Sequence, residues 1–151
     1  MATPSRAHTG GCLCGAVRFR AVGPPTHVVH CHCAMCRKAA GAPVVTFAGF
    51  PAERVRFTKG KPKIYRSSSF ARRGFCARCG GAMTFQYDAH SERLSFNAGC
   101  FDQPGRLKPS HHLYAENMIA WLHMDDGLPR YEGEGELSPR PTPRRRARRG
   151  T

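Results

Sequence analysis

The sequence contains no long apolar run. None of its hydrophobic stretches approaches the roughly 20 consecutive apolar residues of a membrane-spanning helix, which excludes a transmembrane anchor. The first ten residues also lack the apolar segment of a signal peptide, so we do not expect export. We therefore expect a cytoplasmic, reducing environment, where the eight cysteines would serve as metal ligands or reactive thiols rather than form disulfides.

Helical periodicity is also missing. No stretch of ten or more residues shows the spacing of an amphipathic helix, and only residues 34–40 and 118–123 indicate a helical turn or two. Short apolar segments separated by Gly, Pro and Cys instead predict a mainly β domain. The predicted strands are 16–21, 27–31, 43–50, 55–58, 63–66, 82–87, 94–98 and 112–115. The predicted core includes Phe47, Phe50, Phe85, Phe96 and Trp121.

Acidic residues are scarce, since 10 Asp and Glu stand against 24 Lys and Arg, for a net charge of +14. Six of the arginines and no acid lie in residues 138–151, and without that segment the net charge is +8. Metal-bound thiolates would lower the charge of the folded part further. This distribution weakens nucleic-acid binding as the main function. The segment also has no aromatic residue on which a base could stack, so we expect at most weak, nonspecific polyanion binding.

The 151 residues are enough for one domain with a modest core. After Gly133 the Pro-, Arg- and Gly-rich composition cannot bury enough apolar surface to order the chain. We therefore expect a flexible N-terminus at residues 1–8, a metal-stapled β domain at 9–136 and a disordered tail at 137–151. No feature of the sequence indicates an oligomeric state.

Two close cysteine pairs predict a structural zinc site. Cys76 and Cys79 form a Cys-x-x-Cys turn followed by two glycines, a geometry in which two thiolates face one ion. Cys12 and Cys14 form a second glycine-flanked pair. Together the pairs would make a closed tetrahedral site that contributes directly to folding. Two disulfides are the alternative, but a bridge across Cys-x-Cys would be strained.

The remaining cysteines leave two interpretations open. Cys31, Cys33 and Cys36 can converge on one ion from a single segment and leave its fourth position free, as in catalytic zinc sites. Alternatively, Cys100 completes a second four-cysteine site, and both sites are then structural. Eight cysteines fill two such sites without remainder, so their number does not decide between the two.

The cysteine segments and their flanks resemble the glutathione-dependent formaldehyde-activating enzyme family, also called the Gfa/CENP-V domain family. The segments that carry the resemblance are TGGCLCGAVRF at 9–19, CHCAMCRKAAG at 31–41 and RGFCARCG at 73–80. Later stretches agree with the family pattern at 99–104, 109–114 and 121–131. The resemblance covers about residues 9–133, nearly all of the predicted domain.

The resemblance implies a β-tent fold with two zinc ions per chain. Carried over by motif, the structural zinc would be held by Cys12, Cys14, Cys76 and Cys79. A second, labile and catalytic zinc would be held by Cys31, Cys33 and Cys36. The implied activity is a carbon–sulfur lyase reaction on S-(hydroxymethyl)glutathione or a related small thiol compound. Because the family pattern supplies three local ligands, we expect Cys100 near the second zinc without permanent ligation.

Basic residues beside the cysteines are candidate substrate contacts. Arg37, Lys38 and Arg73 could bind the carboxylates of a glutathione-like ligand, although solvated surface is the simpler interpretation of each. His112 opens a predicted strand and could carry a proton. His32 lies between two cysteines, and its side chain is expected to point away from the metal. The alternative function is a zinc-stapled module that binds nucleic acid or a partner without catalysis.

Overall fold

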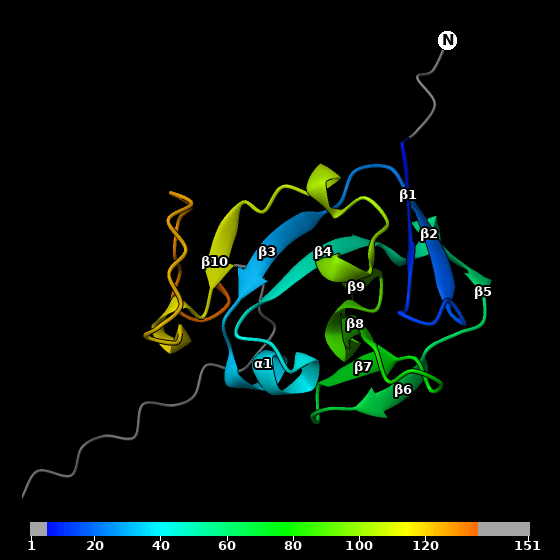
Figure 1. Ribbon diagram of the computed structural model, residues 1–151, viewed down its shortest axis with the longest axis horizontal. Coiled ribbons are helices and arrows are strands. Elements are labelled where there is room, and N and C mark those ends of the chain that lie inside the picture. The colour runs from blue at the N-terminus through cyan, green and yellow to red at the C-terminus, as the bar shows by residue number, and fades with distance from the viewer. Residues whose placement is uncertain (1–5, 136–151) are drawn as a thin grey trace, which may run out of the picture.

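The computed structural model describes residues 6–135. The tail expected at 137–151 and the first five residues lie outside this range. The described chain is mainly β, as predicted (Figure 1). Its strands are β1 (Ala7–Gly11), β2 (Arg18–Val22), β3 (His27–Cys31), β4 (Val45–Pro51), β5 (Val55–Lys59), β6 (Lys63–Arg66), β7 (Ala71–Phe75), β8 (Ala82–Tyr87), β9 (Arg93–Asn97) and β10 (His111–Leu113).

One α-helix and short 3-10 turns complete the described elements. They are α1 (Ala34–Ala40), η1 (Ala52–Arg54), η2 (Asp88–His90), η3 (Ala98–Cys100), η4 (Pro104–Arg106) and η5 (Ala115–Asn117). The helix ends at Gly41, whose φ of 61° places it in the left-handed region that favours glycine. Within residues 6–135, no helix is long and apolar enough to cross a membrane.

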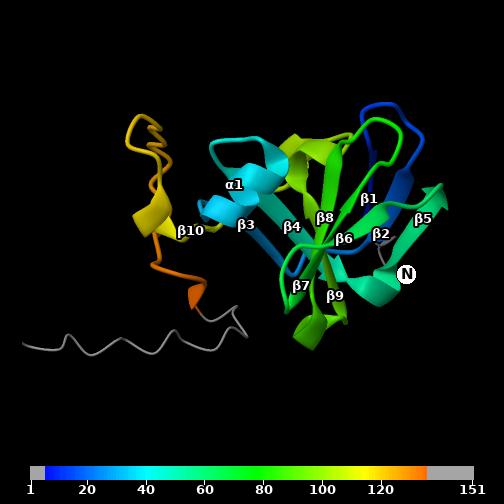
Figure 2. The ribbon, with the colours of Figure 1, turned by 90° about the horizontal axis from the view of Figure 1, so that it is seen from below.

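The strands form two sheets. One has the order β1-β2-β5, and the other has the order β10-β3-β4-β9-β8-β7-β6. The pairings are antiparallel, as expected, except that β10 runs parallel to β3. The three-stranded sheet and β10 lie at opposite ends of the molecule, and α1, which follows β3, lies beside the large sheet (Figures 1 and 2). The β3–α1 junction is therefore near the end that β10 closes.

Aromatic side chains fill the space between the sheets. Phe19, Phe50 and Phe96 are at most 1% exposed, and the rings of Phe19 and Phe96 stack with centroids 3.9 Å apart. A second buried cluster contains Phe47 and Phe85 beside the cysteines at the end of β3. Four of the five predicted core aromatics are thus buried. Trp121 is the exception, and the prediction was wrong there, because its side chain is 68% exposed.

Three local features differ from the sequence-based expectation. Residues 7 and 8, assigned to a flexible N-terminus, begin β1, because Ala7 pairs with Val22 and His8 is buried against the Phe50 ring. Strand β7 was not predicted, since its Arg-Arg-Gly centre shows no alternation of apolar residues. Residues 118–123 form no helix, because the η5 turn stops where Met118 takes an extended conformation with ψ 132°.

Gly10 is required by close packing rather than by an unusual backbone angle. A Cβ there would lie 2.4 Å from the carbonyl oxygen of Cys100 and 2.5 Å from the Cζ atom of Phe19. Phe19 is 1% exposed and has no room to move aside. We expect Gly10→Ala to lower the free energy of unfolding by about 1–3 kcal/mol, the usual cost of overpacking.

Urea denaturation of the variant measures this loss. The control is Gly105→Ala, where an added Cβ meets no atom within 4 Å. Its midpoint should stay close to that of the unmodified protein. Equal midpoints for the two variants would contradict the packing explanation.

Candidate metal centres and adjoining pockets

Four cysteine sulfurs meet between the β1–β2 turn and the β7–β8 turn. The ligand atoms of Cys12, Cys14, Cys76 and Cys79 all lie within 4.8 Å of one another. The Sγ atom of Cys14 is 3.7 Å from that of Cys12 and 3.8 Å from that of Cys76. Zinc–sulfur bonds of about 2.3 Å in a tetrahedron place the sulfurs about 3.8 Å apart. The geometry therefore fits a four-coordinate metal site.

Two similar turns build this group. The Cys12 N–H donates to the Val17 carbonyl at 3.0 Å, and the Cys76 N–H donates to the Gly81 carbonyl at 3.0 Å. Each pair ends in a left-handed glycine, Gly15 with φ 75° and Gly80 with φ 74°. These glycines let the chain reverse immediately after the second cysteine, so that both thiols of a pair face the same side.

The thiols of this group have unequal pKa values. Burial raises the pKa of Cys12, but the Val17 N–H, 3.3 Å from its sulfur, and the neighbouring thiols outweigh burial and lower that pKa to about 6. The Ala16 N–H lowers the pKa of Cys14, but burial and the other sulfurs raise it to about 11. A cation at the centre would allow all four thiolates to form together.

The second cysteine group lies at the junction of β3 and α1. Cys31 ends β3, Cys33 caps α1, and the Cys36 N–H donates to the Cys33 sulfur at 3.3 Å. The three sulfurs lie within 4.8 Å of one another, and each residue is at most 6% exposed. The Cys33 and Cys36 sulfurs, together with burial, raise the pKa of Cys31 far above its ordinary value. Such a buried set of donors suits a thiophilic cation.

Arg73 of β7 contacts the same group. Its Nη2 atom donates to the Cys36 sulfur at 3.4 Å, and its guanidinium lies 4.8 Å from the centroid of the Phe85 ring. The contact places a positive charge beside the thiol and favours its ionised form. Strand β7, which the sequence did not predict, therefore brings a predicted site residue to the cysteines.

Cys100 is in neither group. Within residues 6–135, the sets of converging ligand atoms that contain cysteine do not include its sulfur. The Cys100 thiol donates to the Ala82 carbonyl at 3.3 Å. Burial, followed by the charges of Cys12 and Cys79, raises its pKa to about 11, so the thiol is neutral at pH 7. Cys100 is partly buried and packs against the main core, and its sulfur is not one of the ligand atoms of the three-cysteine group, in keeping with the absence of permanent ligation expected from the sequence.

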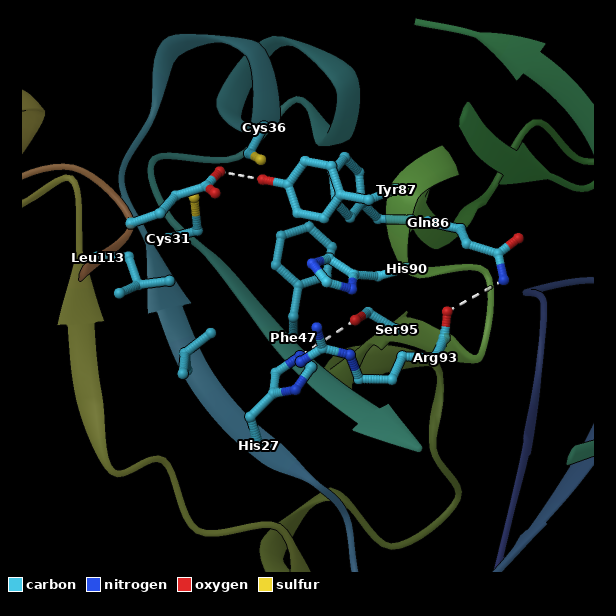
Figure 3. A pocket seen from close by; sticks show the side chains of 13 residues that line it. His27, Cys31, Cys36, Phe47, Gln86, Tyr87, His90, Arg93, Ser95 and Leu113 are labelled. Atoms are coloured by element: carbon cyan, nitrogen blue, oxygen red, sulfur yellow. Dashed lines mark hydrogen bonds between the residues drawn. The ribbon is translucent and has the colours of Figure 1, made fainter. Parts of the chain in front are cut away.

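Two pockets adjoin the three-cysteine group, and Cys36 and Phe47 line both. The first is shown in Figure 3, with Cys31 and Cys36 at one end and the His27 and Arg93 side chains at the other. Its walls are largely apolar, and a Tyr87 hydroxyl donates to the Glu134 carboxylate at its edge.

The second pocket is more basic. It is lined by Lys38 and Arg73 together with Cys36, so two of the predicted substrate contacts lie beside the cysteine group. The other two line neither pocket. The Arg37 Nε atom donates to the His32 carbonyl at 3.2 Å, and the His112 side chain is fully buried.

A buried histidine–aspartate chain lies behind the three-cysteine group. The Nε2 atom of His32 is 2.8 Å from Nδ1 of His112, and Nε2 of His112 is 2.8 Å from an Asp126 carboxylate oxygen. Burial and nearby positive groups lower the pKa of His32 to about 4, so its ring is neutral at pH 7. Sequence reasoning missed Asp126, because no local pattern connects it to a histidine 14 residues earlier in the chain.

A family model described as "Glutathione-dependent formaldehyde-activating enzyme" matches residues 7–117. The chain belongs to this family. The matched residues contain both cysteine groups, so the resemblance carried by the cysteine segments is confirmed.

Three individual proteins are similar to the chain. The chain is 31% identical over 125 residues to a putative glutathione-dependent formaldehyde-activating enzyme of Halomonas elongata, covering 77% of this chain and 80% of the relative. It is 33% identical over 94 residues to an uncharacterized lyase of Schizosaccharomyces pombe, covering 62% of this chain and 68% of the relative. A crystal structure of a Rhodobacter sphaeroides protein superposes with a TM-score of 0.49 at 18% identity, covering 82% of this chain and 99% of that one.

Proposed function

We propose that this protein is a cytoplasmic, zinc-dependent carbon–sulfur lyase that acts on S-(hydroxymethyl)glutathione or a related adduct of a small thiol. The observation that carries the proposal is the three-cysteine group, which offers three sulfurs to an ion and adjoins two pockets. A site with three protein ligands keeps a position for substrate, whereas the four-cysteine group is closed. The name of the Halomonas relative supports glutathione as the thiol.

Zinc bound by Cys31, Cys33 and Cys36 would stabilise the substrate sulfur as a thiolate, which makes that sulfur a better leaving group. The role of the three cysteines is to hold the ion against the pocket walls. Arg73 donates a hydrogen bond to the Cys36 sulfur at 3.4 Å and would stabilise negative charge on it. The four-cysteine ion would be structural and would take no part in the chemistry.

Substrate recognition is assigned to the basic pocket. Glutathione carries two carboxylates, and Lys38 and Arg73 place two cationic groups in the wall of a pocket that reaches Cys36. Charge-assisted hydrogen bonds between these groups and carboxylates would orient the thiol end of the ligand toward the cysteines. Arg37 is not assigned this role, because it lines neither pocket and its Nε atom donates to the His32 carbonyl.

The reaction itself needs one proton acceptor. When the adduct breaks down, its hydroxyl loses a proton, a carbon–oxygen double bond forms, and the carbon–sulfur bond breaks to give formaldehyde and a thiolate. Among the described residues that line the pocket of Figure 3, Glu134 is the one carboxylate, and Cys31 and Cys36 line the same pocket. We assign the proton to Glu134, which Tyr87 orients by donating its hydroxyl hydrogen.

The proposal is tested by comparing two adducts of formaldehyde, one with glutathione and one with 2-mercaptoethanol, which has no carboxylate. Lys38→Gln should raise KM for the glutathione adduct about 10-fold, the effect of losing one charged hydrogen bond, and leave the KM for the smaller adduct unchanged. Lys59→Gln is the matched control, because Lys59 is exposed on β5 and lines none of the pockets beside the cysteines.

Formaldehyde release from protein that carries two zinc ions per chain is the measurement. No release from either adduct would contradict the lyase proposal and favour the alternative of a zinc-stapled binding module. Equal KM changes for the two adducts would contradict the assigned carboxylate contact.

A further inference from the structure

The segment that carries the three cysteines is attached to the last described part of the chain by buried side chains. His32 lies between Cys31 and Cys33 and is fully buried, and so is its partner His112. Asp126 closes the chain at the protein surface, where its side chain is 29% exposed. The histidine–aspartate chain therefore connects His32 with His112, 80 positions later in the sequence, and ends at Asp126, a surface residue that can be substituted.

Asp126 determines the direction of the hydrogen bond to His112. The Leu128 N–H and the His112 imidazole lower the pKa of Asp126, so the carboxylate is ionised and accepts hydrogen bonds. Nε2 of His112 must then donate to Asp126, and one hydrogen lies between Nδ1 of His112 and Nε2 of His32. The other ring nitrogen of His32, Nδ1, is buried without a hydrogen-bond partner. Asp126 thus orients the His112 ring, which in turn contacts the His32 ring.

The backbone makes the same connection. Strand β10 pairs in parallel with β3, so that Leu113 lies opposite Cys31, and the His32 N–H donates to the Leu113 carbonyl at 3.1 Å. On its other side, the His112 N–H donates to the Pro129 carbonyl at 2.8 Å. Figure 1 shows β10 between β3 and the last described segment. We call residues 111–131 the strap, because this segment pairs with the end of β3 at Cys31 and hydrogen-bonds to His32, the residue between the first two cysteines of the group.

We propose that His112 and Asp126 are positioning residues that determine how firmly the three-cysteine group retains its metal ion. The three ligands come from six consecutive residues, so their geometry depends on how well this short segment is held in place. Hydrogen bonds behind metal ligands commonly change metal affinity 10- to 100-fold. The inference rests on the proposed occupancy of this group by zinc.

The four-cysteine group provides an internal reference. Its two turns are closed by their own backbone hydrogen bonds, at Val17 and Gly81, and within residues 6–135 no hydrogen bond joins them to the histidine–aspartate chain. Loosening the strap should therefore release one metal ion faster and leave the other unchanged.

The experiment compares Asp126→Ala with Asp125→Ala, two losses of one negative charge at adjacent positions. Asp125 is exposed and serves as the matched control. Both variants are loaded with zinc, and release to a chromogenic chelator is followed under reducing conditions. In Asp126→Ala, one of the two zinc equivalents should be released about 10- to 100-fold faster, with the melting temperature nearly unchanged. Asp126→Asn, which keeps an acceptor oxygen, should restore most of the retention.

The outcomes separate this inference from the proposed function. Two equivalents with release rates unchanged by Asp126→Ala would overturn the inference and leave the proposed function intact. A single equivalent in the unmodified protein would overturn both. Faster release of both ions, in step with a lower melting temperature, would show a merely structural role and overturn the inference. A third zinc equivalent that is lost when Asp126 is replaced would also overturn the inference, because His30, His112 and Asp126 would then be metal ligands themselves.

Discussion

A Cys79→Ser variant is expected to lose its cooperative thermal transition and to aggregate, even with zinc present. The four-cysteine group links two turns that are distant in the sequence, since the sulfurs of Cys14 and Cys76 are 3.8 Å apart although the residues are 62 positions apart. Structural zinc contributes about 10–16 kcal/mol to folding in small zinc domains, whereas a typical domain is stable by only about 5–15 kcal/mol. Loss of one of the four thiolates should therefore remove most of the net stability.

Circular dichroism melting and sedimentation velocity under reducing conditions measure this effect. Cys100→Ser is the control, because Cys100 is a neutral thiol outside both groups and its removal should keep two zinc ions per chain. A cooperative melt of Cys79→Ser near the temperature of the unmodified protein would contradict a structural role for the four-cysteine group.

Cys33→Ser is expected to keep the fold and to lose both one zinc equivalent and most of the lyase activity. The serine oxygen can still accept the Cys36 N–H at the start of α1, so the helix keeps its cap. With two sulfurs left, the group no longer holds its ion, and kcat/KM for the glutathione adduct should fall about 1,000-fold or more, a loss of about 4 kcal/mol of transition-state stabilisation.

Metal analysis and initial rates test this second prediction. Cys33→Ala, which removes the cap as well as the ligand, should match the activity loss but lower the melting temperature further. If Cys33→Ser destabilised the protein as strongly as Cys79→Ser, the division between a structural and a catalytic group would be wrong.

Most strands could be predicted because their sequences alternate or carry short apolar runs between glycines and prolines. Strand β7 could not, since Arg73 faces a pocket and Gly74 is required where a Cβ would lie 2.2 Å from the Thr84 hydroxyl oxygen. The residues of β7 are thus determined by contacts with a pocket and a neighbouring strand, and they lack the alternation of apolar and polar residues that is typical of a strand. The exposure of Trp121 was unpredictable for a similar reason, because a large aromatic residue is buried in most proteins.

The cysteine spacing predicted which sulfurs would come together, because the members of each turn are neighbours in the sequence. The position of Cys100 could not be predicted, since a lone cysteine has no spacing from which to argue. The histidine–aspartate chain was beyond sequence reasoning as well. Its members are brought together by the parallel pairing of β10 with β3, and no local signal indicates which strand a three-residue segment will join.

The distance along the chain between the two halves of the four-cysteine group has a consequence for biosynthesis. Five of the eight cysteines precede residue 37, whereas Cys76 and Cys79 leave the ribosome much later. An ion that reaches the nascent chain early meets Cys12 and Cys14 together with the next three cysteines, and any four of these thiolates complete a closed, misligated centre. An ion that arrives after synthesis meets both native groups. We therefore expect the yield of correctly loaded protein to depend on when zinc is supplied as well as on how much.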